Sequence, residues 1–343
     1  MPRFLKSLAS QSYEDVQFVF HNNASSDNTR EILEDFKSSL PESKVLVRNY
    51  LFQAGGADYG MRIRWFPHES DFVCIRSSND VMDPEYLRSC VEILDSDPNI
   101  GLAYSNGYLV YEENPTVGEY RKEIEIFTKL EDPEDSVRQC VGRYTQSFPL
   151  WGVYRRPVYE KLSSWRQTCY GLDHVLVCEA SLYGSIRSTG EPMDFRVVPS
   201  KRDANQTYDE INTMWVNHHV MQGLDISQED PLSPWDRELP FHSMLMGYLD
   251  MFRTARIRGD LKLDLIQVAK DEFIQRFSKI LSLESEMFVG KTISNLPGVQ
   301  KRLEICDKYL LSSRTDLHRW LWAINSTTPQ YKEEVNQIIL SIQ

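Results

Sequence analysis

Short apolar runs alternate with amphipathic segments in the first third of the chain, and this alternation limits the folds that it can adopt. In the amphipathic segments apolar residues recur three and four positions apart, as they do on the buried face of a helix. Strands that alternate with helices at short spacing predict an α/β fold with a mostly parallel sheet flanked by helices. The expected strands are 16–20, 44–47, 72–75 and 101–111, and the expected helices are 2–11, 28–40, a segment ending near 66, and 84–96.

The stretch 71–87 joins a buried strand to a polar loop and a helix start. The apolar run ends at Arg76, and a cluster of serine, asparagine and aspartate follows. Asp83 and Pro84 then suit the N-cap and the first position of a helix. Ligands of open α/β sheets bind at the carboxyl ends of the strands. The sequence therefore predicts a ligand site in the loop 76–80.

The second half of the chain is expected to be largely helical. Residues 112–135 are charged and broken by prolines, so we expect an insertion or lid there. The Pro- and acid-rich stretch 226–240 predicts a boundary between a domain of residues 1–225 and a helical C-terminal subdomain of residues 226–343. Further strands are expected at 148–154 and at two places within 185–198, and further helices at 172–183, 205–222, 240–257, 262–282, 297–312, 315–325 and 328–342.

Charge and cysteine content limit the partners and the compartment. The net charge of −12 and the pI of about 5.2 argue against nucleic acid as a partner, because such proteins are usually basic. The six cysteines form no CxxC pair or zinc pattern, which indicates reduced structural thiols and a cytoplasmic location. No stretch has the apolar length of a membrane span, and no signal peptide is expected. Trp320 and Trp322 leave open a peripheral contact with the inner face of a membrane, and a homo-oligomer is also left open.

Four stretches together resemble the family 2 glycosyltransferases of the GT-A fold. The segment 7–36, which holds the loop HNNASSDNT, looks like that family's helix–strand–loop–helix, and SSNDVMDP at 77–84 is similar to its Asp-x-Asp-Asp segment ahead of a proline. WGVYRR at 151–156 and the segment 170–190 are similar to the acceptor-side half of one subgroup. The resemblance, which covers residues 1–200, implies a GT-A-like (Rossmann-like) fold. It also implies inverting transfer of a sugar from a nucleotide-diphosphate donor to a hydroxyl acceptor, with a glycan expected, as in polysaccharide biosynthesis.

The chemistry of such a transfer defines the side chains that the site needs. The leaving diphosphate gathers negative charge, which a Mg or Mn cation or a cationic side chain stabilises. The attacking hydroxyl needs a general base. The resemblance implies Asp173 as the base and Asp80 as the metal ligand, and two arginines that follow a predicted strand can reach a phosphate. The residues expected to bind the donor are Asn22, Ser25, Asp27, Ser77, Asn79, Asp80, Arg155 and Arg156.

The sequence departs from the family pattern at positions that usually carry negative charge. Asn22 stands where the family has the first Asp of its nucleotide loop. Ser77 and Asn79 stand where the metal segment is acidic, so that Asp80 is the carboxylate that remains. An amide oxygen is neutral and attracts a dication less strongly. We therefore expect weak metal binding, or stabilisation of the leaving group by Arg76 or another cation.

Each candidate also has a structural interpretation. Asn79 and Asp80 can shape a turn, Asp173 can cap a helix, and the neighbouring His174 is a further candidate acid–base group. The family's usual first strand, ahead of the helix 2–11, has no counterpart here; a truncated sequence, a replacement strand or a degenerate donor site would each explain this. The alternative function is therefore a non-catalytic glycosyltransferase-like protein that binds a partner.

Overall fold

The computed structural model describes residues 1–22, 24–49, 70–111, 114–121, 126–143, 148–163, 169, 171–198 and 240–289. The chain divides into two compact units. The first unit comprises residues 1–127, 145–160 and 184–226, and the second comprises residues 128–144, 161–183 and 227–343. Two helical segments from the middle of the chain thus belong with the C-terminal helices. The predicted boundary near residue 226 lies outside the described residues and stays a prediction.

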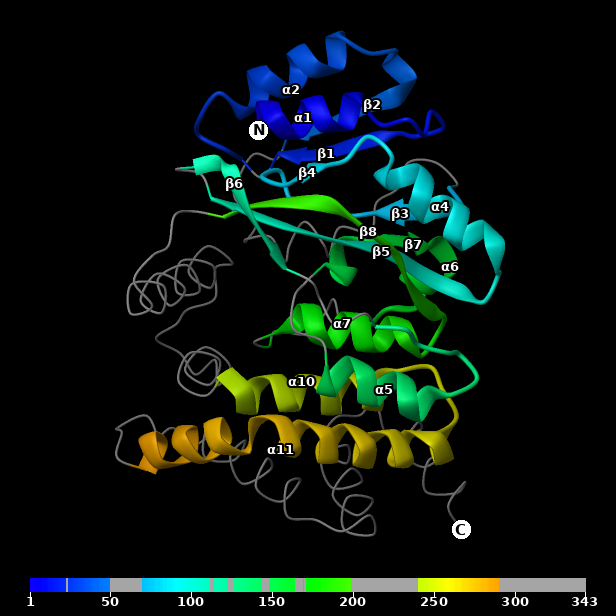
Figure 1. Cartoon of the computed structure of the whole chain (residues 1–343), viewed down its shortest axis with the longest axis vertical. Coiled ribbons are helices and arrows are strands. Elements are labelled where there is room, and N and C mark those ends of the chain that lie inside the picture. Colours follow the sequence, from blue (N-terminus) through cyan, green and yellow to red (C-terminus); the bar gives the residue numbers. More distant parts are fainter. Residues whose placement is uncertain are drawn as a thin grey trace. The chain divides into compact units, whose positions relative to one another are not determined.

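The described strands of the first unit form two sheets (Figure 1). A two-stranded sheet pairs β1 (Phe18–Asn22) with β2 (Val45–Asn49). A six-stranded sheet has the order β3-β7-β5-β8-β4, with β6 paired to β5. Its strands are β3 (Phe72–Cys74), β4 (Val81–Met82), β5 (Ile100–Tyr111), β6 (Asn114–Arg121), β7 (Val153–Arg155) and β8 (Ser185–Val198).

The pairing directions are more mixed than the alternation of strands and helices suggested. β1 pairs with β2 and β5 pairs with β8 in parallel, whereas the four pairs β3–β7, β5–β7, β5–β6 and β4–β8 are antiparallel. Residues 75–80, between β3 and β4, are too few for a crossover to a parallel position, which takes about a dozen residues. β4 therefore joins the sheet as an antiparallel strand beside β8. The class is α/β, with a mixed sheet.

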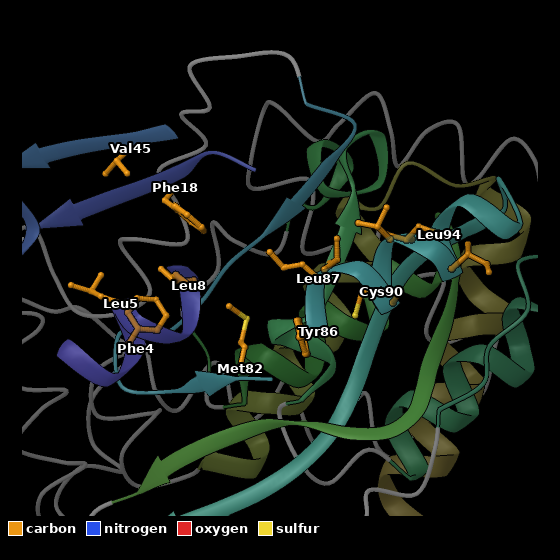
Figure 2. Packing of buried hydrophobic residues seen from close by; sticks show 14 of the residues in the cluster. Phe4, Leu5, Leu8, Phe18, Val45, Met82, Tyr86, Leu87, Cys90 and Leu94 are labelled. Atoms are coloured by element: carbon orange, nitrogen blue, oxygen red, sulfur yellow. The ribbon is translucent and has the colours of Figure 1, made fainter. Parts of the chain in front are cut away.

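Three helices of the first unit share one hydrophobic core with the strands (Figure 2). The helices are α1 (Pro2–Ala9), α2 (Thr29–Ser38) and α4 (Tyr86–Ser96), and the 3-10 helix η1 (Glu42–Lys44) precedes β2. Phe4, Leu5 and Leu8 of α1 lie at helical spacing and are all buried, as their pattern predicted. They pack in the same cluster as Phe18 of β1 and Leu87 of α4. This core holds the two sheets on a common set of helices.

The start of α4 differs from its prediction. The helix begins at Tyr86, and Glu85 occupies the N-cap position without a side-chain cap. Asp83 instead accepts a hydrogen bond from the Glu85 N–H at 2.9 Å, and its carbonyl accepts the Tyr86 N–H at 3.0 Å. These bonds close a tight turn before the helix. The turn places β4 and the loop before it in a defined position against β8.

The predicted insertion at 112–135 is wrong for its described residues. Residues 114–121 form β6, which pairs with β5, and residue 133 begins a helix. The two short strands expected within 185–198 are one strand, β8, whose register with β5 shifts near Asn106. The strand expected at 148–154 divides into the 3-10 helix η2 (Pro149–Trp151) and β7, which leads into α6 (Arg156–Lys161).

The described part of the second unit is helical. α5 (Pro133–Gly142), α7 (Leu172–Ser181), α10 (Pro240–Thr254) and α11 (Gly259–Val289) pack against one another. Asp132 caps α5 by accepting the Asp135 N–H at 3.1 Å. The fully buried Glu179 of α7 accepts the backbone N–H and the hydroxyl of Ser163. The helices expected at 205–222 and beyond residue 290 lie outside the described residues.

No helix in the described ranges is long and apolar enough to cross a membrane.

Candidate functional site

Asn22 ends β1 and ties three backbone segments together. Its side chain is buried, with 5% of the residue exposed. The amide Nδ2 donates to Asn49 Oδ1 at the end of β2, at 2.9 Å, and Oδ1 accepts the Ser25 N–H at 3.1 Å. A carboxylate at this position could accept from Ser25 but could not donate to Asn49. The asparagine therefore stabilises this loop, because its amide can donate to the Asn49 amide oxygen as well as accept from Ser25.

The loop after β1 presents polar groups to solvent. Ala24 has a positive φ of 56°, a left-handed conformation that non-glycine residues seldom adopt. Its N–H bonds the Asn22 carbonyl at 2.9 Å, so the chain turns sharply there. Ser25 and Asp27 are exposed beyond this turn. Asp27 accepts the Thr29 N–H at 3.0 Å at the start of α2, and its hydrogen bonds to Thr29 lower its pKa. The loop thus offers a hydroxyl and a carboxylate at the end of a strand.

The loop after β3 carries the second set of predicted residues. Ser78 and Asn79 are exposed, Ser77 is half-buried, and Asp80 is only 6% exposed. The Asp80 N–H donates to the Ser77 carbonyl at 3.3 Å, and the Asn79 N–H donates to the Ser77 hydroxyl at 3.4 Å. The turn that the structural interpretation expected is therefore present. Within it the Asp80 carboxyl points away from solvent and the others stay accessible.

Arg76, at the start of this loop, is committed to an internal ion pair. Its guanidinium donates to both carboxylate oxygens of Asp194 on β8, at 3.1 and 2.5 Å, and to the Trp151 carbonyl at 3.2 Å. The side chains of Arg76 and Asp194 are 6% and 0% exposed. The suggestion that Arg76 stabilises a leaving group is wrong for this arrangement, because its charge is already neutralised inside the protein. Arg76 instead anchors the loop to β8.

Asp80 lies beside this ion pair and beside a second arginine. β4 and β8 pair with Val81 opposite Phe195, so the next position along the ladder places Asp80 opposite Arg196. Burial, and after it the negative charge of Asp194, raise the pKa of Asp80 to about 6. Arg76, Arg196 and a hydrogen bond with the Val197 backbone act in the opposite direction. Two carboxylates and two guanidinium groups therefore form one charge group on this part of the sheet.

The side chains of this charge group do not fit a divalent cation well. A dication prefers several carboxylate oxygens, and of the two carboxylates Asp194 is occupied by Arg76. Asp80 then stands alone, beside the positive charge of Arg196. Among the described residues no group of three or more His, Cys, Asp or Glu side chains is arranged to hold a metal ion. The role of Asp80 as a metal ligand stays a prediction that this geometry does not favour.

Arg155 and Arg156 lie at the other end of β3. Arg155 pairs with Phe72, the first residue of that strand. Its guanidinium donates to carbonyl groups of Leu94 and Ile100, at 2.5 and 3.0 Å, around the end of α4. Arg156 forms an ion pair with Glu160 at 2.8 Å. Their predicted contact with a phosphate is untested, and this placement favours a structural role.

Asp173 is in the second unit, on the first turn of α7. Gly171 is the N-cap residue, with a φ of 65°, so the alternative that Asp173 caps the helix is wrong. Asp173 and the adjacent His174 are both half-buried. Burial, together with the charge of Arg276, lowers the pKa of His174, although Asp173 acts in the opposite direction. The lowered pKa favours the neutral imidazole, the form that can accept a proton. The assignment of Asp173 as base stays a prediction.

Asp194 and Arg196 were missed by the sequence reasoning. A signal for them existed, since two opposite charges stand two residues apart in the segment 193–198, which is otherwise apolar. Residues two apart in a strand lie on the same face. The pattern therefore marks one face of β8 as charged.

The first unit is an α/β domain with polar loops at the ends of its strands, where domains of this class bind ligands. Residues 1–156, a little under half of the chain, match the family model described as glycosyl transferase family 2. The matched segment, which contains both polar loops, is therefore similar to a glycosyltransferase domain. No curated protein matches the chain.

Several solved structures are similar to this chain. TarS residues 1–349 from S. aureus in complex with UDP-GlcNAc is 13% identical, with a TM-score of 0.44, and the match covers 83% of this chain and 87% of that chain. The mannosyltransferase PcManGT from Pyrobaculum calidifontis in complex with GDP-Man and Mn2+ is also 13% identical, with a TM-score of 0.40, and the match covers 90% and 82%. Both TM-scores are low, so the family match carries the assignment.

Proposed function

We propose that the chain is an inverting glycosyltransferase that moves a sugar from a nucleotide-diphosphate donor to a hydroxyl of a glycan. The observation that carries this proposal is the family match over residues 1–156, which contains both polar loops of the first unit. These loops follow β1 and β3, where ligands of α/β sheets bind. Glycan acceptors and polysaccharide biosynthesis follow from the family resemblance alone.

The loop after β1 is the proposed nucleoside site. Asn22 sets its shape through the bonds to Asn49 and Ser25. Ser25 and Asp27 are exposed, so that their hydroxyl and carboxylate oxygens are available to ribose or base. The amide in place of a family carboxylate still offers hydrogen bonds, although Asn22 uses them within the protein. Its proposed role is therefore to position the loop.

The loop after β3 is the proposed diphosphate site. Ser77 and Asn79 offer neutral donors to phosphate oxygens, and Asp80 lies behind them. Arg155 and Arg156 are left out of this site, because they lie at the opposite end of β3. Asp80 would be the carboxylate that binds a Mg or Mn ion, although the neighbouring positive charge of Arg196 opposes such binding. The chemistry that such an ion supplies is neutralisation of the leaving diphosphate.

Asp173 is the proposed general base. In inverting transfer the acceptor hydroxyl attacks the anomeric carbon from the face opposite to the leaving diphosphate, and the base takes the hydroxyl proton. His174, whose lowered pKa favours its neutral form, is suited to hold the adjacent carboxylate or the acceptor. A reducing compartment such as the cytoplasm suits the five described cysteines, which are all free thiols. Peripheral membrane contact and homo-oligomers are not needed for this proposal.

The test combines donor binding with transfer. Nucleoside diphosphates are titrated into the protein by calorimetry, with EDTA and with MnCl2, and nucleotide release is measured with a panel of nucleotide sugars and glycan acceptors. We expect Asp173→Asn to abolish transfer while donor affinity stays close to that of the wild type. Asp260→Asn is the matched control, because Asp260 is a carboxylate in the first turn of α11 in the same unit. Full activity of Asp173→Asn would exclude this residue as the base.

The alternative of a non-catalytic binding protein is favoured by one observation. Asp80 is the sole carboxylate of its loop and is almost fully buried, so the donor site is poorer in accessible negative charge than the family pattern. The same experiment separates the two functions. Absence of nucleotide binding both with and without manganese would support the alternative and reject the enzyme.

A further inference from the structure

Arg196 of β8 carries hydrogen-bond donors that have no acceptor in the described part of the chain. Its Nε and Nη2 atoms are buried, and neither has a partner there. A buried donor without an acceptor costs about 1–3 kcal/mol, and more when the group is charged. The residue as a whole is only half-buried, so part of it contacts solvent. Such an arrangement is what a site for an anion needs.

The surroundings of Arg196 hold its guanidinium in place without using its donors. The ring of the fully buried Phe148 lies under the guanidinium, with 4.3 Å from Cζ to the ring centroid. This cation–π contact fixes the plane of the group and leaves its edges free to donate. Gly107 makes room here, because a Cβ at that position would lie 2.8 Å from Phe148 Cε1. The fork of donors is therefore pre-organised, as bidentate recognition of a phosphate requires.

Arg196 is also the available cation at the proposed diphosphate loop. It lies across the β4–β8 ladder from Asp80, the last residue of that loop. The other arginine of the charge group, Arg76, already donates to both carboxylate oxygens of Asp194. The Arg196 guanidinium, whose Nε and Nη2 atoms have no partner among the described residues, thus lies beside Asp80 and the loop where the leaving group would lie.

We propose that Arg196 binds the diphosphate of the donor and stabilises it as it leaves, in the role that a divalent cation would otherwise fill. This inference rests on the proposed function. It names the group that stabilises the negative charge of the leaving diphosphate. In the transfer, the bond from the anomeric carbon to the diphosphate oxygen breaks, and its electron pair goes to that oxygen. The acceptor oxygen bonds to the anomeric carbon, and its proton goes to the general base of the reaction. Arg196 donates hydrogen bonds throughout and transfers no proton.

The test is calorimetric titration of the full chain with UDP, GDP and inorganic pyrophosphate, each in EDTA. We expect the wild type to bind pyrophosphate and at least one nucleotide without metal. Arg196→Ala should weaken this binding about 10- to 100-fold, the loss of charge-assisted hydrogen bonds to phosphate. Arg196→Lys keeps the charge and loses the fork, so its affinity should be intermediate. Because the lysine variant changes the packing least, it also tests the inference if the alanine variant folds poorly.

The matched control is Arg187→Ala on the same strand. Arg187 also lies over an aromatic ring, that of Phe127 at 3.8 Å, but it donates to the Ile186 carbonyl next to it. Its removal should leave diphosphate affinity unchanged. Wild-type affinity in either Arg196 variant would overturn the inference, as would wild-type binding that vanishes in EDTA and returns with manganese. If pyrophosphate binding depends on Arg196 but no sugar is transferred, the inference stands and the proposed function fails.

Discussion

Asp80→Asn should make the protein more stable at neutral pH while it weakens the donor site. The folded chain holds Asp80 at a pKa of about 6, raised from an ordinary 3.8, chiefly by burial. Between these two pH values the folded state binds more protons than the unfolded state, so stability falls as pH rises through this window. Above pH 6 the full cost of the buried carboxylate is present. Each pKa unit is worth about 1.4 kcal/mol, which sets an upper limit of about 3 kcal/mol.

The gain from the substitution is smaller than this limit. An asparagine side chain can still accept a hydrogen bond from the Val197 backbone, but it no longer offsets the charge of Arg196. We therefore expect Asp80→Asn to be more stable than the wild type by about 1–3 kcal/mol at pH 8. About half of the carboxylate's cost is already present at pH 5, so the difference should grow by about 1.4 kcal/mol from pH 5 to pH 8.

Urea unfolding of both proteins at several pH values between 5 and 8 measures this difference. Other titrating groups are common to both proteins and cancel. Asp71→Asn is the control, because Asp71 is an exposed carboxylate just before β3 and should shift stability by less than about 0.5 kcal/mol. The reasoning is refuted if Asp80→Asn is the less stable protein at pH 8, or if its advantage does not change with pH.

Further predictions concern the residues around this site and in the core. Asp194→Asn should lower the free energy of unfolding by about 3–5 kcal/mol, since it leaves the Arg76 cation buried and unpaired; a loss below about 1 kcal/mol in urea unfolding would contradict this. Gly107→Ala should fail to fold or lose several kcal/mol, because its Cβ would lie under 3 Å from backbone and ring atoms. Gly190→Ala has open space and should cost only about 1–2 kcal/mol for its positive φ, and equal thermal stabilities of the two variants would refute the difference. Cys90 is buried and its pKa is raised, so a maleimide at pH 8 should label it only after denaturation; rapid labelling of the native protein would show that the core around it opens.

The helices and single strands of the first unit could be predicted because each buries one face. α1 and α2 lie within two or three residues of their predicted bounds, since apolar side chains recur at helical spacing in both. β1 is shifted by two residues from the predicted run, which shows how weakly the ends of a short strand are encoded. The start of α4 was misplaced because Asp83 uses its side chain to close a turn and not to cap the helix.

The pairing of the strands could not be predicted in the same way. β4 and β7 have two and three residues, too few for a periodic signal, and both pair antiparallel with strands distant in sequence. The same limit applies to the site. Position at a strand end identified the loop before β4. The ion pair between Arg76 and Asp194, however, joins residues 118 apart, and the local sequence around either residue does not predict its partner. Arg76 therefore looked available when it is not.

The outer edges of β1 and β3 carry a consequence for how this protein behaves at high concentration. Each strand has a partner on one side, β2 and β7, and neither is paired on its other side by a strand of the described ranges. Exposed strand edges recruit other extended chains, which is a common route to aggregation. The same property makes them addressable, because a synthetic peptide of alternating apolar residues can add to such an edge as a further strand.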